Sequence, residues 1–343
     1  MVERNSNSVK VSVVVPNWNG IDSLAPCLDS LLGQSKACRI IVVENGSKDG
    51  SLEFVQQKYP QIELIIHQNN KGFAGGVNAG IRKSIAGGDE YVALFNNDAV
   101  ADKDWLKNLV ADLEINTDTG IVTCKLMDSA KKHLDSTGEG YSTWGLPYPR
   151  GRGEPVSDHY DDQVQIFAAS GGASMYRTSM LKQIGLFDED FFAYYEDVDI
   201  SFRAQLAGWK VRYVPEALAY HQIGATSSKI KGFTTYQTIK NLPWLLYKNA
   251  PLSVLVRILP KFLFAYFSFV VSAAWRGQSW PALRGYYKML VLLPKKTLER
   301  WRTQHHSKVP ASYIWVCMTP GLPPNARKLS MLRHPLKALN RRA

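Results

Sequence analysis

The chain of 343 residues has few cysteines, and they form no recognisable pattern. Its four cysteines, at positions 27, 38, 124 and 317, are scattered without the close pairs of a metal site or a dense disulfide framework. The sequence also does not open with a basic segment followed by a long apolar core. We therefore expect a protein of the reducing cytoplasm that is not secreted.

Acidic residues are nearly absent from the last third of the chain. Residues 229–343 contain 20 of the 41 Lys and Arg but only 1 of the 30 Asp and Glu. An acidic body joined to a strongly basic tail favours a polyanionic partner, either nucleic acid or an anionic membrane surface. We expect two parts, a folded body over residues 1–228 and a basic, apolar helical region over residues 229–343.

A long uninterrupted apolar run is also missing. The stretch Leu252–Trp275 is broken by Arg257, Pro260 and Lys261, whereas a span of the bilayer core needs about 20 apolar residues. Trp and Tyr interleaved with Lys and Arg are typical of helices that lie in an anionic membrane interface. Core helices of a second domain, or a hairpin that dips into the membrane, are the alternatives. We do not expect a nucleic-acid partner, because the aromatic residues stand within apolar stretches rather than in a polar groove.

The first hundred residues have the pattern of an α/β fold. With 45% hydrophobic and 21% charged residues, the composition is that of a folded protein. Strand-like apolar runs alternate with helix-like segments, which predicts a mainly parallel, Rossmann-like sheet with helices on both faces. The expected strands are 10–15, 39–43, 63–67 and 91–95, and the expected helices are 22–34, 50–59 and 74–85. Residues 133–165, rich in Gly, Pro and Asp, are expected to form a long functional loop or lid.

Polar residues follow the expected strands. The apolar run 92–95 ends in Asn96, Asn97 and Asp98, and polar, glycine-containing stretches follow the other three strands. Ligand sites of open α/β sheets gather at this edge, so Asp98 stands where a divalent cation could be held. The glycines would let the backbone approach an anion, but G-x-G-x-x-G spacing is missing, which weakens a nicotinamide reading. Ordinary turns, with an Asx turn or helix cap at Asp98, are the alternative.

Two further features could carry chemistry. Glu196 and Asp197 follow an aromatic cluster and begin an expected helix, where the helix dipole favours carboxylates and keeps one available as a proton acceptor. Capping of that helix is the alternative role. His221 follows the short expected strand 210–214 and is either a metal ligand or an ordinary surface or core histidine.

Taken in order, these motifs resemble the inverting glycosyltransferases of family 2, which have the GT-A fold, near the rhamnosyltransferase-like branch. The segments that carry the resemblance are VVVPNWNG, VVENGSKDGS, NKGFAGGVNAG, LFNNDA, GLFDEDFFAYYEDVDISFR and HQIGATS. They make residues 1–228 the expected catalytic domain. The resemblance implies that the nucleotide sugar is surrounded by Pro16, Asn17, Asn19, Glu44, Asn70, Gly72, Phe73, Gly76, Asn78, Asn96 and Asn97.

The resemblance also assigns the reacting groups. It implies Asp98 and His221 as ligands of Mg²⁺ or Mn²⁺, Asp197 as the base and Glu196 as the group that positions the acceptor. Such a sparse ligand set should bind metal well only with nucleotide present. Glu44 departs from the aspartate common in the family, and LFNNDA keeps only the last acid of the Asp-x-Asp motif. The segment 170–173 is implied to lie beside donor and acceptor, with a tight turn as the alternative.

We therefore expect a metal-dependent transferase that moves L-rhamnose from dTDP-L-rhamnose in bacterial cell-surface polysaccharide synthesis. The acceptor would be a saccharide or a polyprenyl-diphosphate-linked sugar, and the enzyme would sit peripherally at the inner face of the cell membrane. Another donor, such as a UDP-hexosamine or UDP-galactofuranose, is an alternative. A non-catalytic membrane or nucleic-acid binding protein on a degenerate transferase fold is another, although the intact acids and His221 argue against it.

Overall fold

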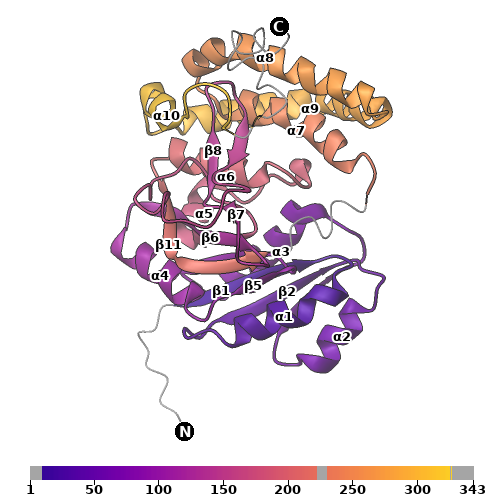
Figure 1. The fold of residues 1–343 in the computed structure, drawn as a ribbon, viewed down its shortest axis with the longest axis vertical. Helices are drawn as coiled ribbons and strands as arrows, with labels where there is room; N and C mark the ends of the chain where they lie inside the picture. Colours follow the sequence, from indigo (N-terminus) through magenta and orange to yellow (C-terminus); the bar gives the residue numbers. More distant parts are fainter. Residues whose placement is uncertain (1–9, 222–229, 325, 327–343) are drawn as a thin grey trace, which may run out of the picture.

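The computed structural model describes residues 10–221, 230–324 and 326. Figure 1 shows a body built around a sheet, with a layer of long helices above it. The strands are β1 (Val11–Asn17), β2 (Arg39–Asn45), β3 (Glu63–His67), β4 (Tyr91–Phe95), β5 (Ala99–Ala101), β6 (Thr119–Asp128), β7 (Leu134–Ser136), β8 (Glu139–Tyr141), β9 (Pro147–Pro149), β10 (Ala173–Arg177) and β11 (Lys210–His221). The helices are α1 (Ile21–Leu32), α2 (Ser51–Lys58), α3 (Gly72–Ala86), α4 (Trp105–Ile115), α5 (Thr178–Ile184), a 3₁₀ turn η1 (Glu189–Phe191), α6 (Glu196–Leu206), α7 (Phe233–Asn249), α8 (Leu252–Trp275), α9 (Ser279–His305) and α10 (Ala311–Cys317).

The main sheet has the order β3-β2-β1-β4-β10-β6-β11-β5, and β7 pairs with β6. The first four strands are parallel to their neighbours, as the alternating pattern predicts. β10 runs antiparallel to both β4 and β6, because a long insertion rather than a crossover helix leads into it. The expected α/β body is confirmed, and its second half mixes strand directions.

Both faces of the sheet are covered, which explains the continuous apolar runs. Val13 and Val15 of β1 belong to the apolar cluster that includes α1, α2 and α4. Val14, between them, points to the opposite cluster with α3, α5 and α6. Alternating residues of one strand therefore enter two separate cores, and no face of β1 is left for water.

Residues 133–165 are more regular than expected. They contain β7, which joins the main sheet, and the hairpin β8-β9. Tyr141 of the hairpin stacks on Phe167, which lies outside it, with ring centroids 4.9 Å apart. The expectation of a long structureless loop is wrong, because strands of three residues are too short to show a period of two in the sequence.

The helix α8 corrects a second expectation. It runs without interruption over Leu252–Trp275, through Arg257, Pro260 and Lys261. A window of 18 residues within it has a mean hydropathy of 1.9, which makes α8 the one helix of the described chain long and apolar enough, by length and composition, to cross a membrane. Two cations in 24 residues neither end the helix nor make it polar. The apolar helix is therefore longer than the charge-free run that follows Lys261.

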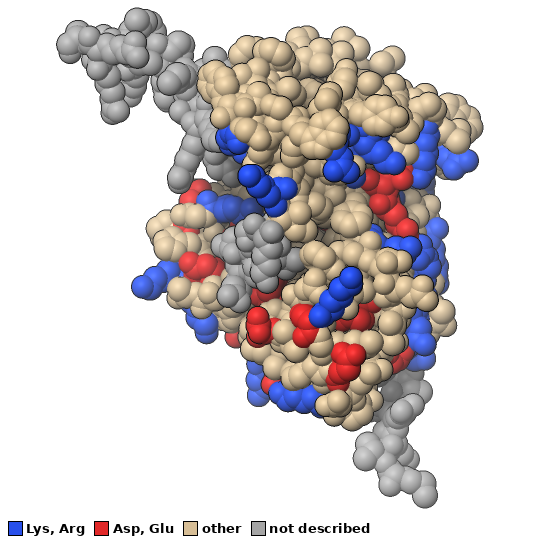
Figure 2. Space-filling view, turned by 90° about the vertical axis from the view of Figure 1, so that its right-hand side faces the viewer, with Lys and Arg blue, Asp and Glu red and all other residues tan. Residues whose placement is uncertain are grey.

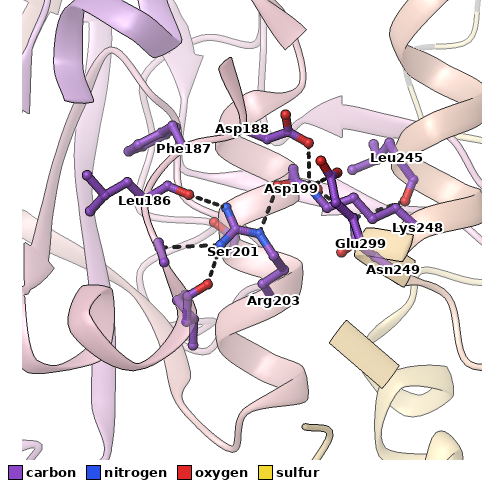
Figure 3. A network of polar contacts seen from close by, with 12 residues as sticks. Leu186, Phe187, Asp188, Asp199, Ser201, Arg203, Leu245, Lys248, Asn249 and Glu299 are labelled. Atoms are coloured by element: carbon purple, nitrogen blue, oxygen red, sulfur yellow. Dashed lines mark hydrogen bonds and ion pairs between the residues drawn. The ribbon is translucent and has the colours of Figure 1, made fainter. Parts of the chain in front are cut away.

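A buried ionic network joins the helical layer to the body (Figure 3). Lys248 of α7 places its Nζ 2.7 Å from Asp188 Oδ2 and 2.9 Å from Asp199 Oδ1. Lys296 of α9 also contacts Asp188, at 2.6 Å, and Arg203 contacts Asp199 at 2.9 Å. Burial alone would raise the pKa of both aspartates, but these cations hold the pKa of Asp188 and Asp199 below the usual range.

The substitution Asp199→Asn should lower the free energy of unfolding by about 3–5 kcal/mol, because it leaves Arg203 buried without its carboxylate partner and removes one of the two closest counter-charges of Lys248. Urea denaturation measures this loss. As a control, Lys210→Met removes an exposed ion pair with Asp118 and should cost about 1 kcal/mol or less. A folded-state pKa below the unfolded value stabilises at higher pH, so the difference between wild type and Asp199→Asn should shrink as the pH falls below about 4. Equal losses in both variants would contradict the network's role.

Candidate active site

A cavity of about 820 Å³ lies at the carboxyl ends of β1 and β4. It is lined by eleven of the fifteen residues predicted for the site: Pro16, Asn17, Asn70, Gly72, Phe73, Asn96, Asn97, Asp98, Glu196, Asp197 and His221. The other four, Asn19, Glu44, Gly76 and Asn78, do not line it. The structure thus brings together residues separated by more than 200 positions in the sequence.

One hydrogen-bonded chain fixes the strand ends. Asn17 Nδ2 donates to Glu44 Oε2 at 2.7 Å and to Ser51 Oγ at 2.9 Å. Asn17 Oδ1 accepts from Asn97 Nδ2 at 2.7 Å, so β2, β1 and the end of β4 are tied across the edge of the sheet. Glu44 is buried behind the cavity wall. Its longer side chain therefore serves this network, and a contact with the base stays a prediction.

The start of α3 closes a second wall. Asn70 Oδ1 accepts from the Gly72 amide at 2.7 Å, and Asn45 Nδ2 donates to the Gly72 carbonyl at 2.9 Å. Gly72 has φ +73°, and a Cβ there would meet the Phe192 carbonyl oxygen at 2.3 Å. Only glycine fits this close approach. Gly76 lies one turn further on, where a Cβ would contact Asn45 Nδ2 at 3.3 Å.

Two predicted residues use their polar atoms on the protein itself. Asn19 Oδ1 accepts from the Lys48 amide at 2.8 Å. Asn78 is buried, and its Nδ2 donates to the Phe187 carbonyl and to Glu189 Oε1, both at 2.9 Å. These contacts hold loops in place, and nucleotide binding by either asparagine stays a prediction.

Asp98 and His221 meet because of strand register. β11 runs antiparallel to β5 and pairs His221 with Ala99, which places Asp98 next to the imidazole. His221 Nε2 lies 3.0 Å from Asp98 Oδ1, and Nδ1 lies 2.8 Å from Asp135 Oδ2. Asp135 belongs to β7, within the stretch expected to be a loop, and sequence spacing gave no signal for it.

The charge of this group is balanced. Burial alone would lower the pKa of His221, but hydrogen bonds to Asp135 and Asp98 raise it to about 9. Arg152 Nη2 lies 3.0 Å from Asp135 Oδ1 and is half exposed at the cavity wall. Two carboxylates thus alternate with two cations, and Arg152 is a second residue that the sequence reading missed.

The pair Asp98 and His221 fits a divalent cation, which would replace the proton between Asp98 Oδ1 and His221 Nε2. Asp135 faces the other ring nitrogen, as carboxylates commonly do behind metal-ligating histidines. Another group of acids, Asp188, Asp190 and Glu299, is also close enough to hold a cation. Lysine ammonium groups already lie among those acids, however, so they suit a metal less well.

Asp197 and Glu196 have different environments at the start of α6. Asp197 accepts from the Gly171 amide at 2.9 Å and the Val198 amide at 2.8 Å, which favours its ionised form. Burial, opposed by these amides, leaves the pKa of Asp197 above its usual range. Burial and the charge of Asp197 raise the pKa of Glu196 to about 8. The two amide hydrogen bonds therefore favour the negative charge on Asp197, and that charge disfavours a second one on Glu196.

A third carboxyl faces the same charge. Glu139 of β8 lines the cavity, and burial with the charge of Asp197 raises its pKa to about 8. Its Oε1 accepts from Ser136 Oγ at 3.2 Å. The sequence reading missed Glu139 because it lies in a short strand of the hairpin. The segment 170–173 behaves as expected in position, since Gly171 and Gly172 line the cavity between Asn96 and Asp197.

The loop before the acid pair is strained. Phe192, Tyr194 and Tyr195 have φ of 65°, 69° and 72°, the left-handed region that costs about 1–3 kcal/mol for each residue other than glycine. All three line the cavity. A strained aromatic loop directly before Glu196 and Asp197 indicates a wall whose shape is held for a ligand.

Comparisons with known proteins identify the family of the chain. The family model "Glycosyl transferase family 2" matches residues 12–185. A dTDP-rhamnosyl transferase, RfbF, of Shigella flexneri is 25% identical over 263 residues, covering 73% of this chain and 84% of that protein. The N-acetylglucosaminyl-diphospho-decaprenol L-rhamnosyltransferase of Mycobacterium tuberculosis is 26% identical over 228 residues, covering 55% of this chain and 68% of that protein.

Solved structures show the same fold. S. aureus TarS 1-349 in complex with UDP-GlcNAc has a TM-score of 0.53 at 18% identity, covering 90% of this chain and 93% of that one, while the chain spans 44% of a longer TarS structure. The mannosyltransferase PcManGT from Pyrobaculum calidifontis, in complex with GDP-Man and Mn²⁺, has a TM-score of 0.52 at 14% identity, covering 98% and 84%. The fold is therefore GT-A, and the chain belongs to glycosyl transferase family 2 and is a glycosyltransferase.

Proposed function

We propose that the protein transfers L-rhamnose from dTDP-L-rhamnose, with inversion, to a saccharide or polyprenyl-diphosphate-linked acceptor in bacterial cell-surface polysaccharide synthesis. The observation that carries the proposal is the single cavity that holds an amide-bonded Asp197 together with the pair Asp98 and His221. The choice of rhamnose is supported by the names of two relatives.

The ends of β1, β2 and β4 and the start of α3 bind the nucleotide in this proposal. Asn17, Asn70, Asn96 and Asn97 line this part of the cavity, and Phe73 adds an apolar surface. Asp98 and His221 would hold Mg²⁺ or Mn²⁺, and such an ion would supply positive charge to the leaving diphosphate. Arg152, on the same wall, adds a fixed positive charge.

Asp197 then acts as the base. It accepts the proton of the acceptor hydroxyl as that oxygen attacks C1 of the sugar, and a single displacement inverts the configuration. Glu196, whose pKa is raised to about 8 by burial and by the charge of Asp197, has a buried Oε2 without a hydrogen-bond partner in the described part of the chain. This carboxyl can hydrogen-bond the acceptor and position it.

A panel of nucleotide sugars tests the donor. With Mn²⁺ or Mg²⁺ present, dTDP-L-rhamnose should give the fastest turnover, measured as release of the nucleoside diphosphate, and the transferred rhamnose should be α-linked. EDTA should suppress the reaction. Efficient turnover of a UDP-sugar without rhamnose transfer would reject the donor, and full activity in EDTA would reject the metal.

Replacement of Asp197 by Asn tests the base. The loss of a general base typically costs about 10²–10⁴ in rate, so kcat should fall by that factor while the KM for the donor changes little. In the wild type, kcat should fall toward acid pH as Asp197 becomes protonated, at a pH above the usual range of aspartate. Glu196→Gln is the matched control and should retain more activity. The opposite ranking would mean that Glu196 is the base.

The membrane role of residues 229–343 is also part of this proposal. Within the described chain, 17 of the 23 exposed large hydrophobic residues lie on α8, α9 and α10. On α8, Val254, Ile258 and Phe262 are buried against the protein, whereas Val256, Leu263 and Phe267 are exposed. One face of the helix therefore packs on the body and the other is free to enter an apolar phase, which favours a helix lying in the interface.

Charge favours a bilayer as the partner of this apolar face. In Figure 2 the upper part of the visible face is almost free of charged side chains, and Lys and Arg lie along its lower border. The one acid of residues 229–343, Glu299, is engaged by Lys296 at 2.9 Å. An apolar surface bordered by cations is complementary to lipid tails under anionic headgroups. Attachment there would bring the enzyme to a lipid-linked acceptor.

Vesicle sedimentation tests this attachment. Combined replacement of Phe267, Trp275 and Trp280 by Ser should weaken binding to phosphatidylglycerol-containing vesicles by about tenfold or more, because three apolar anchors are lost. High salt should release only part of the wild type, since inserted side chains are not screened. The control is Ile66→Ser with Ile115→Ser, two exposed residues of the body. Equal binding by both variants would make the helical layer an ordinary part of the fold.

A further inference from the structure

Asn241 of α7 lies directly beneath the strained loop that precedes the acid pair. Its Nδ2 is 3.0 Å from the carbonyl oxygen of Phe191 and 2.9 Å from those of Ala193 and Tyr194. The side chain is fully buried. One amide group therefore serves three carbonyls of a four-residue stretch, a concentration that ordinary helix packing does not require.

The neighbouring Lys240 extends this contact. Its Nζ donates to the Asp190 carbonyl at 2.9 Å and to the Phe191 carbonyl at 3.2 Å. A half-buried loop with residues at positive φ cannot satisfy its carbonyls within a helix or a sheet, so donors come from elsewhere. α7 supplies them from two consecutive residues, one charged and one neutral.

The loop connects the α6 side of the cavity with the α3 side. Tyr195, its last residue, is the N-cap of α6 with φ 72°, and Glu196 and Asp197 follow at once. At its other end the Phe192 carbonyl accepts from the Ala74 amide of α3 at 3.2 Å. The conformation that Asn241 holds therefore sets the direction of the acid pair relative to the wall formed by α3.

We infer that Asn241 is a positioning residue, which keeps Phe192, Tyr194 and Tyr195 at positive φ and so aims Asp197 at the acceptor hydroxyl. This inference rests on the proposed function for its catalytic consequence. Asn241 does not line the cavity and does not touch the reacting atoms. Its loss should leave donor binding nearly unchanged and impair the chemical step, because small misplacements of a catalytic group are costly.

The same helix offers a matched control. Asn249 is also fully buried, and its Nδ2 donates to Asp199 Oδ1 at 2.8 Å and to the Leu245 carbonyl at 3.1 Å. Both asparagines leave Oδ1 without a hydrogen-bond partner among the described residues. Asn249 has no hydrogen bond to the loop 192–195 in that part of the chain. Replacement of either asparagine by Ala removes a similar buried amide. Of the two, only Asn241 donates hydrogen bonds to the strained loop.

The experiment compares Asn241→Ala, the milder Asn241→Ser, and Asn249→Ala in the full chain. Two readouts are used: steady-state kinetics over a range of pH with the best donor of the nucleotide-sugar panel, and amide hydrogen exchange of peptides spanning residues 190–199. Both Asn241 variants should lose about 10- to 100-fold in kcat, with the donor KM within about threefold of the wild type. The acid limb of kcat should move, and exchange at residues 192–197 should be faster.

Asn249→Ala should keep the wild-type pH profile and the wild-type exchange at residues 192–197, whatever its stability. Equal kcat losses for Asn249→Ala and the Asn241 variants, or unchanged exchange in both Asn241 variants, would overturn the inference. If the wild type turns over no nucleotide sugar, the proposed function fails separately. Exchange at residues 192–197 then decides alone: faster exchange in the Asn241 variants supports the hold on the loop, and unchanged exchange refutes it.

Discussion

The structure depends on charge compensation between a helical layer that is almost free of acids and a body that supplies them. Lys248 and Lys296 are buried and gain their counter-charges from Asp188 and Asp199 of the body. Buried ions are tolerated only when paired in this way. The pairing fixes α7 against α6, and the same helix then carries Asn241 to the loop before the acid pair. Part of the excess positive charge of residues 229–343 is thus used to attach the helical layer to the body, in addition to any role with an external partner.

A second constraint is the number of carboxyls that share one cavity. Burial and mutual repulsion raise the pKa of Glu139, Glu196 and Asp197. Asp197 receives two amide hydrogen bonds that favour its ionised form, and its charge raises the pKa of the other two carboxyls. Chemically similar carboxyl groups can in this way take different roles, one as a proton acceptor and the others as hydrogen-bond donors, because their local environments differ.

The sequence contained the parallel half of the sheet and most of the cavity wall. Apolar runs ending in Asn17 or in Asn96 to Asp98 follow from local rules, because both faces of each strand are covered. Asp135, Glu139 and Arg152 were missed because they come from short strands and turns whose placement depends on pairing with β6 and on the hairpin β8-β9. The full length of α8 was not predicted, because Arg257, Pro260 and Lys261 interrupt the apolar run, whereas the helix continues through them.

Long-range register explains why the site needed the structure. His221 reaches Asp98 only through the pairing of β11 with β5, and it reaches Asp135 only through the pairing of β7 with β6. A shift of one residue in either pairing would turn the imidazole or the carboxylate to the other face of the sheet. Asp98 and His221 are recognisable from motifs, whereas the carboxylate that orients the imidazole is set by tertiary structure alone. The geometry of the Asp98 and His221 pair therefore depends on the strand pairing along this whole edge of the sheet.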